Sequence, residues 1–222
     1  MTAPLLILPG AMAPALLTEI RTLLAHAAFG EAVAGRDSTD TIVRIAWPEE
    51  SEPAKRAAEI VAGALEQSER FRAAAFPAAM MTPRFHRYDV GMRYAEHTDP
   101  ALLDGSPPLR RDIAMTVALS EPSSYEGGDL VLDLGGATFR WKGEPGDCIL
   151  YSPDLSHRVD PVARGTRLVA VSWIQSTVRG FERRHVLSEI AGVLKELETG
   201  AAPEPHVEAL QCAYFNLIRR WI

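Results

Sequence analysis

The chain has 222 residues, 47% of them hydrophobic and 23% charged. It is therefore long enough for one globular domain with a modest appendage, and too apolar for a disordered or low-complexity protein. The formal net charge of −6 argues against a nucleic-acid-binding protein, which needs a basic surface. Only three of the 23 basic residues are lysines (Lys55, Lys142 and Lys195), and arginine is the residue better suited to bind carboxylates.

Neither the cysteines nor the apolar stretch near the N-terminus indicates export. Cys148 and Cys212 are too few to build a disulfide framework at this length. The apolar stretch 5–17 is interrupted by Pro9 and Pro14, and no basic residue precedes it. We expect a cytoplasmic protein that has no contact with a membrane.

The first ninety residues combine helix and strand. Leucine and isoleucine residues at helical spacing predict a helix over 14–27. Residues 41–47 alternate like a strand. A second helix is expected next, with Ser51 as its N-cap and Pro53 in its first turn.

From residue 85 onwards the sequence consists of short apolar runs separated by glycine and proline turns. The strand-sized segments are 113–119, 130–134, 138–141, 148–151 and 168–174. Short strands at this spacing favour a sandwich or barrel of the jelly-roll type. Helical spacing returns over 182–198, and a break at 200–205 precedes a last amphipathic helix that ends near residue 220.

These segments predict a mainly β fold, in which N-terminal and C-terminal helices brace a double-stranded β-helix (jelly-roll) core. We assign residues 1–180 to this domain and residues 181–222 to a helical appendage. The last amphipathic helix has an apolar face that packs either on the core or on a partner. A homodimer formed through the C-terminal helices is therefore expected.

The strongest chemical signal is the segment His97-Thr98-Asp99, followed much later by His157. Alternate residues of an extended segment face the same side, so His97 and Asp99 can point to one place. Two imidazoles and one carboxylate form the facial triad of non-haem Fe(II) oxygenases, which leaves coordination positions open. The predicted metal ligands are therefore His97, Asp99 and His157.

Arg167 lies ten residues after His157, in an apolar strand that follows Gly165. A buried guanidinium needs an anion, because an unpaired buried charge is costly. Taken alone, Arg167 is best explained by a structural ion pair with an Asp or Glu. Next to the two histidines and Asp99, a bound anionic ligand becomes the preferred explanation.

At this point the sequence resembles the bacterial PKHD-type hydroxylases, which belong to the Fe(II)/2-oxoglutarate dioxygenases related to prolyl 4-hydroxylase. The resemblance covers about residues 84–198. It rests on the ordered segments 85–99, 111–122, 125–130, 146–147, 156–162, 165–167 and 172–176.

The resemblance implies Fe(II) bound by His97, Asp99 and His157, with 2-oxoglutarate as cosubstrate and O₂ as oxidant. It implies L-ascorbate as a candidate reductant, and succinate and CO₂ as products. Arg167 matches the arginine that binds the far carboxylate of 2-oxoglutarate. Tyr88 matches a tyrosine that helps to hold the cosubstrate, although a wall aromatic with a satisfied hydroxyl explains Tyr88 equally well.

Other residues near the triad receive weaker assignments. Tyr94 has the opposite strand parity to His97, so we expect it to pack or to line the rim rather than to contact the metal. His86 is a candidate for lining the pocket. Ala118 stands where relatives have a bulkier residue, which indicates extra room in the barrel.

The predicted function is hydroxylation of an unactivated C–H bond in an amino acid, a peptide or a small metabolite. Two alternatives stay open at this stage. One is a cupin-like metal-dependent hydrolase or isomerase, which would have no use for a buried carboxylate-binding arginine. The other is a non-catalytic module that binds 2-oxoglutarate or a metal, and turnover would exclude it.

Overall fold

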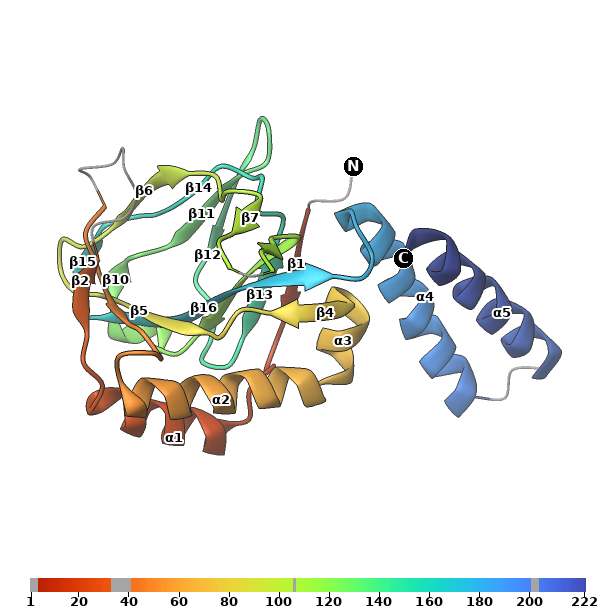
Figure 1. Ribbon diagram of the computed structural model, residues 1–222, viewed down its shortest axis with the longest axis horizontal. Helices are drawn as coiled ribbons and strands as arrows, with labels where there is room; N and C mark the ends of the chain where they lie inside the picture. Colours follow the sequence, from red (N-terminus) through yellow and green to blue (C-terminus); the bar gives the residue numbers. More distant parts are fainter. Residues whose placement is uncertain (1–3, 33–40, 106, 201–203) are drawn as a thin grey trace.

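The computed structural model describes residues 4–32, 41–105, 107–200 and 204–222, and two facing antiparallel β-sheets form its centre (Figure 1). The larger sheet has the order β1 (Leu5–Leu8), β13 (Cys148–Tyr151), β9 (Ile113–Ala118), β16 (Arg167–Ser176), β5 (Arg84–Tyr88), β3 (Val43–Ala46) and β2 (Gly30–Ala32). In addition, β4 (Pro77–Met80) pairs with β16. The smaller sheet has the order β12 (Thr138–Trp141), β11 (Leu130–Asp133), β14 (His157–Val159) and β6 (Tyr94–His97). The predicted mainly β fold with a jelly-roll core is confirmed.

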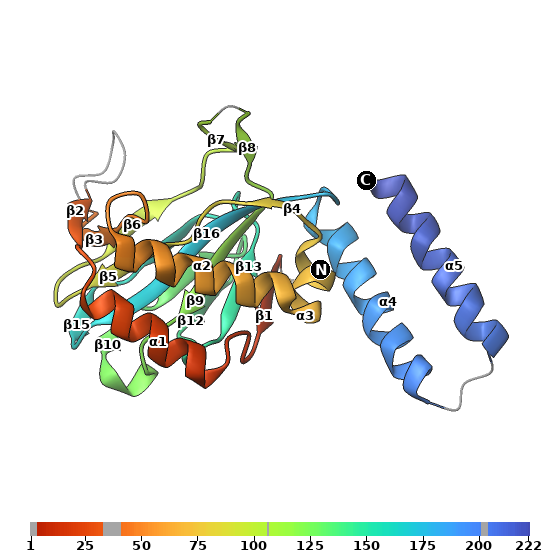
Figure 2. The ribbon, with the colours of Figure 1, turned by 60° about the horizontal axis from the view of Figure 1, so that its bottom comes forward.

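Two short ribbons lie outside these sheets. One pairs β10 (Glu126–Gly127) with β15 (Val162–Arg164), and the other pairs β7 (Leu102–Leu103) with β8 (Leu109–Arg110). The second ribbon projects above the large sheet in Figure 2. A single 3₁₀ turn, Pro122–Ser124, is present in the described part of the chain.

Three N-terminal helices cover the outer face of the larger sheet. They are α1 (Pro14–Ala25), α2 (Glu52–Gln67) and α3 (Glu69–Ala75). Ser51 is the N-cap residue of α2, as predicted, but its hydroxyl accepts no capping hydrogen bond. Pro53 at the second helical position has no N–H, which removes one of the two donors that an N-cap side chain uses.

The strands of the larger sheet are buried on both faces, because the helices cover one face and the smaller sheet covers the other. In β9, Met115 and Val117 pack toward the helices, whereas Ala114 and Ala118 face the smaller sheet. This explains why all six residues of β9 are buried. The core therefore has two layers, and the layer between the sheets holds a large cavity.

Several short strands and one helix were not predicted, and two of these elements show why. The first is β1, which pairs with β13 at the edge of the larger sheet; its continuous apolar run has no alternation that marks a strand. The second is α3, whose seven residues are too few to show helical periodicity. Its N-cap, Ser68, accepts a hydrogen bond from the backbone N–H of Phe71 (3.3 Å).

The C-terminal helices α4 (Phe181–Thr199) and α5 (Glu204–Trp221) project from one side of the sheets (Figures 1 and 2). Leu187 and Leu194 of α4 are buried, and α4 contacts both α3 and α5. By contrast, α5 buries none of its residues. The break predicted at 200–205 lies partly outside the described residues, and the domain boundary at residue 180 stays a prediction.

No helix within the described ranges is long and apolar enough to cross a lipid bilayer.

Candidate functional site

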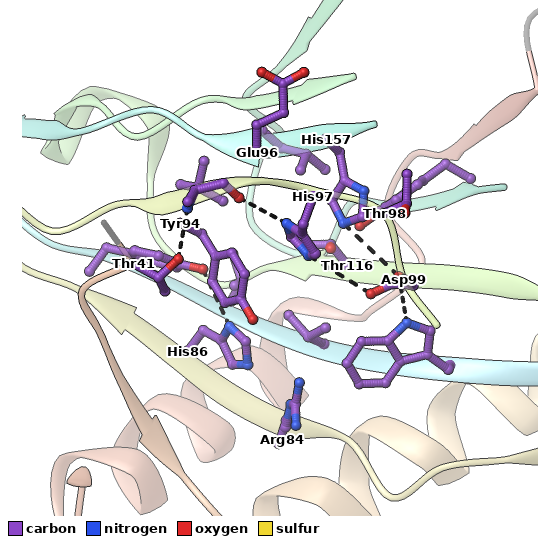
Figure 3. Close-up of a pocket in the computed structure, with 18 of the residues that line it drawn as sticks. Thr41, Arg84, His86, Tyr94, Glu96, His97, Thr98, Asp99, Thr116 and His157 are labelled. Carbon is purple, nitrogen blue, oxygen red and sulfur yellow. Dashed lines mark hydrogen bonds and ion pairs between the residues drawn. The ribbon is translucent and has the colours of Figure 1, made fainter. Parts of the chain in front are cut away.

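A cavity of about 550 Å³ lies between the inner faces of the two sheets. Alternate residues of β5 and β16 line it from the larger sheet, because side chains two apart on a strand share a face. These residues are Arg84, His86, Tyr88, Arg167, Val169, Val171 and Trp173. The smaller sheet and the segment that follows β6 contribute His97, Asp99 and His157, which face Arg84 and His86 across the cavity (Figure 3).

The structure brings His97, Asp99 and His157 together. His97 and His157 are directly opposite each other in the β6–β14 pair, and their ring centroids are 4.2 Å apart. Oδ1 of Asp99 lies 3.8 Å from Nε2 of His97, and Oδ2 lies 4.0 Å from Nε2 of His157. One ligand atom from each residue lies within 4.8 Å of the other two. A divalent cation with metal–ligand distances near ~2 Å fits between these atoms.

The hydrogen bonds around the two imidazoles select the tautomer of each ring. Nδ1 of His97 donates to the carbonyl oxygen of Ala95, and Nδ1 of His157 donates to that of Leu155, each at 2.9 Å. In the neutral tautomer that these bonds select, the lone pair of Nε2 is on the side of the cavity, as metal binding requires. Burial and the neighbouring His97 lower the pKa of His157, which favours its neutral form.

Asp99 is held from the side away from the histidines. The indole Nε1–H of Trp173 donates to Oδ2 of Asp99 at 2.7 Å (Figure 3). The guanidinium of Arg111 lies 3.9 Å from Oδ1. Both contacts hold the carboxylate in position beside the two histidines.

Tyr94 lies on the same face as His97, and the opposite-face prediction is wrong. Across β6 and β14, Tyr94 pairs with Val159 while His97 pairs with His157, so β6 has one extra residue between the two pairs. Such a β-bulge shifts the alternation of side chains. The ring of Tyr94 lies 4.6 Å from that of His97 and lines the cavity.

Arg167 is the first residue of β16 and is 3% exposed. Among the described residues, no carboxylate lies within ion-pair distance of its guanidinium, so the alternative of a structural ion pair finds no partner. Tyr88 is directly opposite on β5, and the Arg167 guanidinium lies 5.2 Å from the centre of its ring. An unpaired buried guanidinium in a cavity next to a metal-ligand set fits a small dicarboxylate.

His86 lies between Arg84 and Tyr88 on the same face of β5. Its Nδ1 is 3.3 Å from the hydroxyl oxygen of Tyr88. Burial and the positive charges of Arg84 and Arg167 hold the pKa of His86 well below its usual value, so the ring is neutral. Burial also raises the pKa of Tyr88, which keeps its hydroxyl protonated and able to donate.

The extra room that the sequence predicts at Ala118 is not part of the cavity. Ala118 is buried between the sheets but does not line the cavity, so the extra room expected from it is not found there. The larger sheet presents Thr116 of the same strand instead.

Sequence reasoning missed Arg84, Arg111 and Trp173. Arg84 has the same strand parity as Tyr88, and Trp173 has the same parity as Arg167, so period-two spacing from the predicted site could have found both. Arg111 lies between β8 and β9, where no such spacing applies.

Comparison with known proteins agrees with this geometry. The sequence profile described as the 2OG-Fe(II) oxygenase superfamily matches residues 83–175. A PKHD-type hydroxylase of Xanthomonas campestris pv. campestris is 34% identical over 98% of this chain and 98% of its own length. One from Methylobacterium nodulans is 37% identical over 86% of each chain. A prolyl-4-hydroxylase of Pseudomonas putida has a similar fold, with a TM-score of 0.56 and 19% identity over 78% of this chain and 94% of that one.

Proposed function

Because this chain belongs to the PKHD-type hydroxylases of the 2OG-Fe(II) oxygenase superfamily, we propose that it hydroxylates an unactivated C–H bond of an amino acid, a peptide or a small metabolite. Family membership makes the protein a 2-oxoglutarate-dependent hydroxylase. The proposal adds the coupled conversion of 2-oxoglutarate to succinate and CO₂, together with the roles of individual residues.

The proposal depends on the side chains that line one cavity. Three potential metal ligands converge in it, and a buried guanidinium without a carboxylate partner lies on the wall of the same cavity. His97, Asp99 and His157 would hold Fe²⁺, which when bound supplies the redox chemistry with O₂. A hydrolase or isomerase would need the metal but not Arg167.

The side chains of the cavity have separable tasks in this proposal. His97 and His157 present Nε2 because a backbone carbonyl oxygen accepts the hydrogen on Nδ1. Trp173 keeps the carboxylate of Asp99 oriented. Arg167 would bind the far carboxylate of 2-oxoglutarate, and the protonated hydroxyl of Tyr88 would donate to it.

The apolar part of the wall limits access of water. Leu130 and Val159 line the cavity from the smaller sheet, and Val169 and Val171 line it from the larger one. Exclusion of bulk water strengthens the electrostatic interactions of Arg167 with a bound dicarboxylate and protects reactive species from side reactions.

The proposal is tested by measuring succinate formed from 2-oxoglutarate by the Fe(II)-loaded full-length protein. His97→Ala and Asp99→Ala should abolish turnover and metal binding, whereas the control His185→Ala, on α4 and outside the cavity, should retain both. Arg167→Ala should weaken 2-oxoglutarate binding at least ten-fold and leave metal binding within about two-fold, since a lost charge-assisted hydrogen bond is worth about 1.5–3 kcal/mol. Unchanged succinate release in both metal-ligand variants would refute the metal assignment, and equal losses of both ligands in Arg167→Ala would make that residue structural.

An untargeted metabolite screen with and without 2-oxoglutarate would identify the substrate as the precursor of a product heavier by one oxygen atom. The succinate assay, run with and without ascorbate, tests our further proposal that ascorbate is a reductant that increases the number of turnovers. A cytoplasmic location stays a prediction.

A further inference from the structure

A second group of cations lies in the cavity, apart from Arg167. The guanidinium carbons of Arg84 and Arg111 are 4.6 and 4.5 Å from the ring centre of Trp173. Arg84 also lies 4.8 Å from the ring centre of Trp47. The two arginines and the indole of Trp173 on which they stack all line the cavity.

These two arginines have no adequate anionic partner in the described part of the protein. Arg84 has no ion pair there, and the nearest carboxylate oxygen to Arg111 is Oδ1 of Asp99 at 3.9 Å, beyond hydrogen-bond distance. The Arg111 side chain is 10% exposed, and the buried Nε atoms of both arginines lack a hydrogen-bond partner. Stacking on aromatic rings offsets only part of the cost of burying two such cations.

Arg84 and Arg167 occupy strand positions that are farther apart than the two carboxylates of 2-oxoglutarate. Arg167 pairs with Tyr88 and Arg84 pairs with Val171 in the β16–β5 register. Four residues of β-strand span about 13 Å. The two carboxyl carbons of 2-oxoglutarate are joined by four C–C bonds of about 1.5 Å each, so this molecule is much shorter than the spacing between the strand positions of Arg167 and Arg84.

The charges of the cavity also leave room for one more anion. Three arginines (Arg84, Arg111 and Arg167) and two carboxylates (Glu96 and Asp99) line it. The double positive charge of Fe²⁺ is matched by the double negative charge of 2-oxoglutarate. One net positive charge therefore remains in the cavity.

We propose that the hydroxylated substrate carries a free carboxylate, which Arg84 and Arg111 bind against the indole of Trp173. The planar guanidinium groups match a carboxylate in shape and in the sign of its charge. A phosphate monoester would bring nearly two charges. The contact of Trp173 with Asp99 places the rest of such a substrate next to the metal ligands. This proposal rests on the proposed function, and it favours free amino acids and similar acids over internal residues of a peptide.

The test uses the full-length protein loaded with Zn²⁺ and 2-oxoglutarate, because Zn²⁺ has no redox chemistry and the complex does not turn over. The probes are the proteinogenic L-amino acids, each as the free carboxylate and as its C-terminal amide. Binding is measured by ligand-observed saturation-transfer NMR. At least one free amino acid should bind ten-fold or more tightly than its amide.

Arg84→Gln and Arg111→Gln should each abolish this preference. Arg84→Gln, which leaves every contact of Asp99 intact, should also keep the affinity for 2-oxoglutarate within two-fold. Arg84→Lys keeps the positive charge and loses the planar pair of N–H donors, so it should retain part of the preference for the carboxylate. This variant covers the case in which the glutamine variants do not fold. The control Arg140→Gln removes an arginine that pairs with Asp129 outside the cavity, and it should change neither affinity.

Three results would overturn the inference: no amino acid binds, carboxylates and amides bind equally, or Arg84→Gln weakens 2-oxoglutarate binding as much as Arg167→Gln does. Failure here is distinguishable from failure of the proposed function. Succinate formation without a carboxylate preference refutes only this inference, whereas a carboxylate preference without any succinate formation refutes only the proposed function.

Discussion

Replacement of Trp173 by phenylalanine should weaken metal binding through Asp99. The substitution removes the indole N–H that donates to Oδ2 of Asp99 at 2.7 Å and keeps an aromatic ring in place. A hydrogen bond to a charged group is worth about 1.5–3 kcal/mol, and loss of a partner of a metal ligand commonly costs about 10- to 100-fold in affinity. We therefore expect the dissociation constant of Zn²⁺ or Fe²⁺ to rise by about 10- to 100-fold.

The chain offers a matched control for this substitution. Trp141 is 6% exposed and Trp173 is 5% exposed, so Trp→Phe removes a similar amount of buried surface at both positions. Trp141 lies in β12 and does not line the cavity. Competition of Zn²⁺ with a chromogenic chelator measures the affinity, and thermal melting of the metal-free proteins measures stability. If Trp173→Phe binds Zn²⁺ as tightly as Trp141→Phe does, the indole has no role in orienting Asp99.

Three further outcomes are expected. Gly165→Ala should lower the free energy of unfolding by about 2 kcal/mol more than Gly135→Ala does. The two glycines have nearly equal positive φ (75° and 73°), so the backbone strain of an alanine is similar at both. A Cβ at Gly165, however, would lie 2.2 Å from a backbone carbonyl oxygen, whereas a Cβ at Gly135 would meet nothing within 4 Å. Equal losses in urea unfolding would contradict this reasoning. The pKa of His86 is depressed in the folded state, so folding favours the neutral ring. The stability that depends on this neutral ring is fully present above the unfolded pKa of about 6.5. It is lost as the pH falls, by at most about 1.4 kcal/mol per pH unit. The metal-free His86→Gln variant should accordingly lose less stability between pH 7 and pH 5 than the unchanged protein, and identical slopes would count against a neutral buried His86. Finally, Phe215 on α5 is 51% exposed, and Phe215→Ser should convert the expected homodimer into a monomer in light scattering, whereas a monomeric unchanged protein would exclude the dimer.

The sequence was sufficient to predict elements whose pattern extends over several residues, and site residues whose spacing along the chain brings their side chains to one place. Helix α1 follows from apolar periodicity, strands such as β9 follow from short apolar runs between turn residues, and the grouping of His97, Asp99 and His157 follows from alternation on an extended segment and from resemblance to a family. These features depend on local geometry, which residue order specifies directly.

The features that were missed depend on contacts between distant segments. The bulge that turns Tyr94 toward His97 is a mismatch between β6 and β14, and it is not encoded by the residues of β6 alone. Arg111 reaches Trp173 from a loop that is 62 residues away in the chain. A strand as short as β1 acquires its identity from pairing with β13 rather than from a pattern of its own.

Strand β16 carries both Arg167 and Trp173, and this restricts how the protein can change during evolution. It is paired with β5 and β4 on one edge and with β9 on the other, so its register is fixed along its length. Insertion of one residue would turn one of the two side chains out of the cavity. Insertion of two residues would keep the face and move them apart by about 7 Å. The separation between the end of the cavity at Arg167 and the end at Trp173 can therefore change only in large steps, and relatives that accept larger or smaller substrates are expected to differ in loops such as the one that carries Arg111.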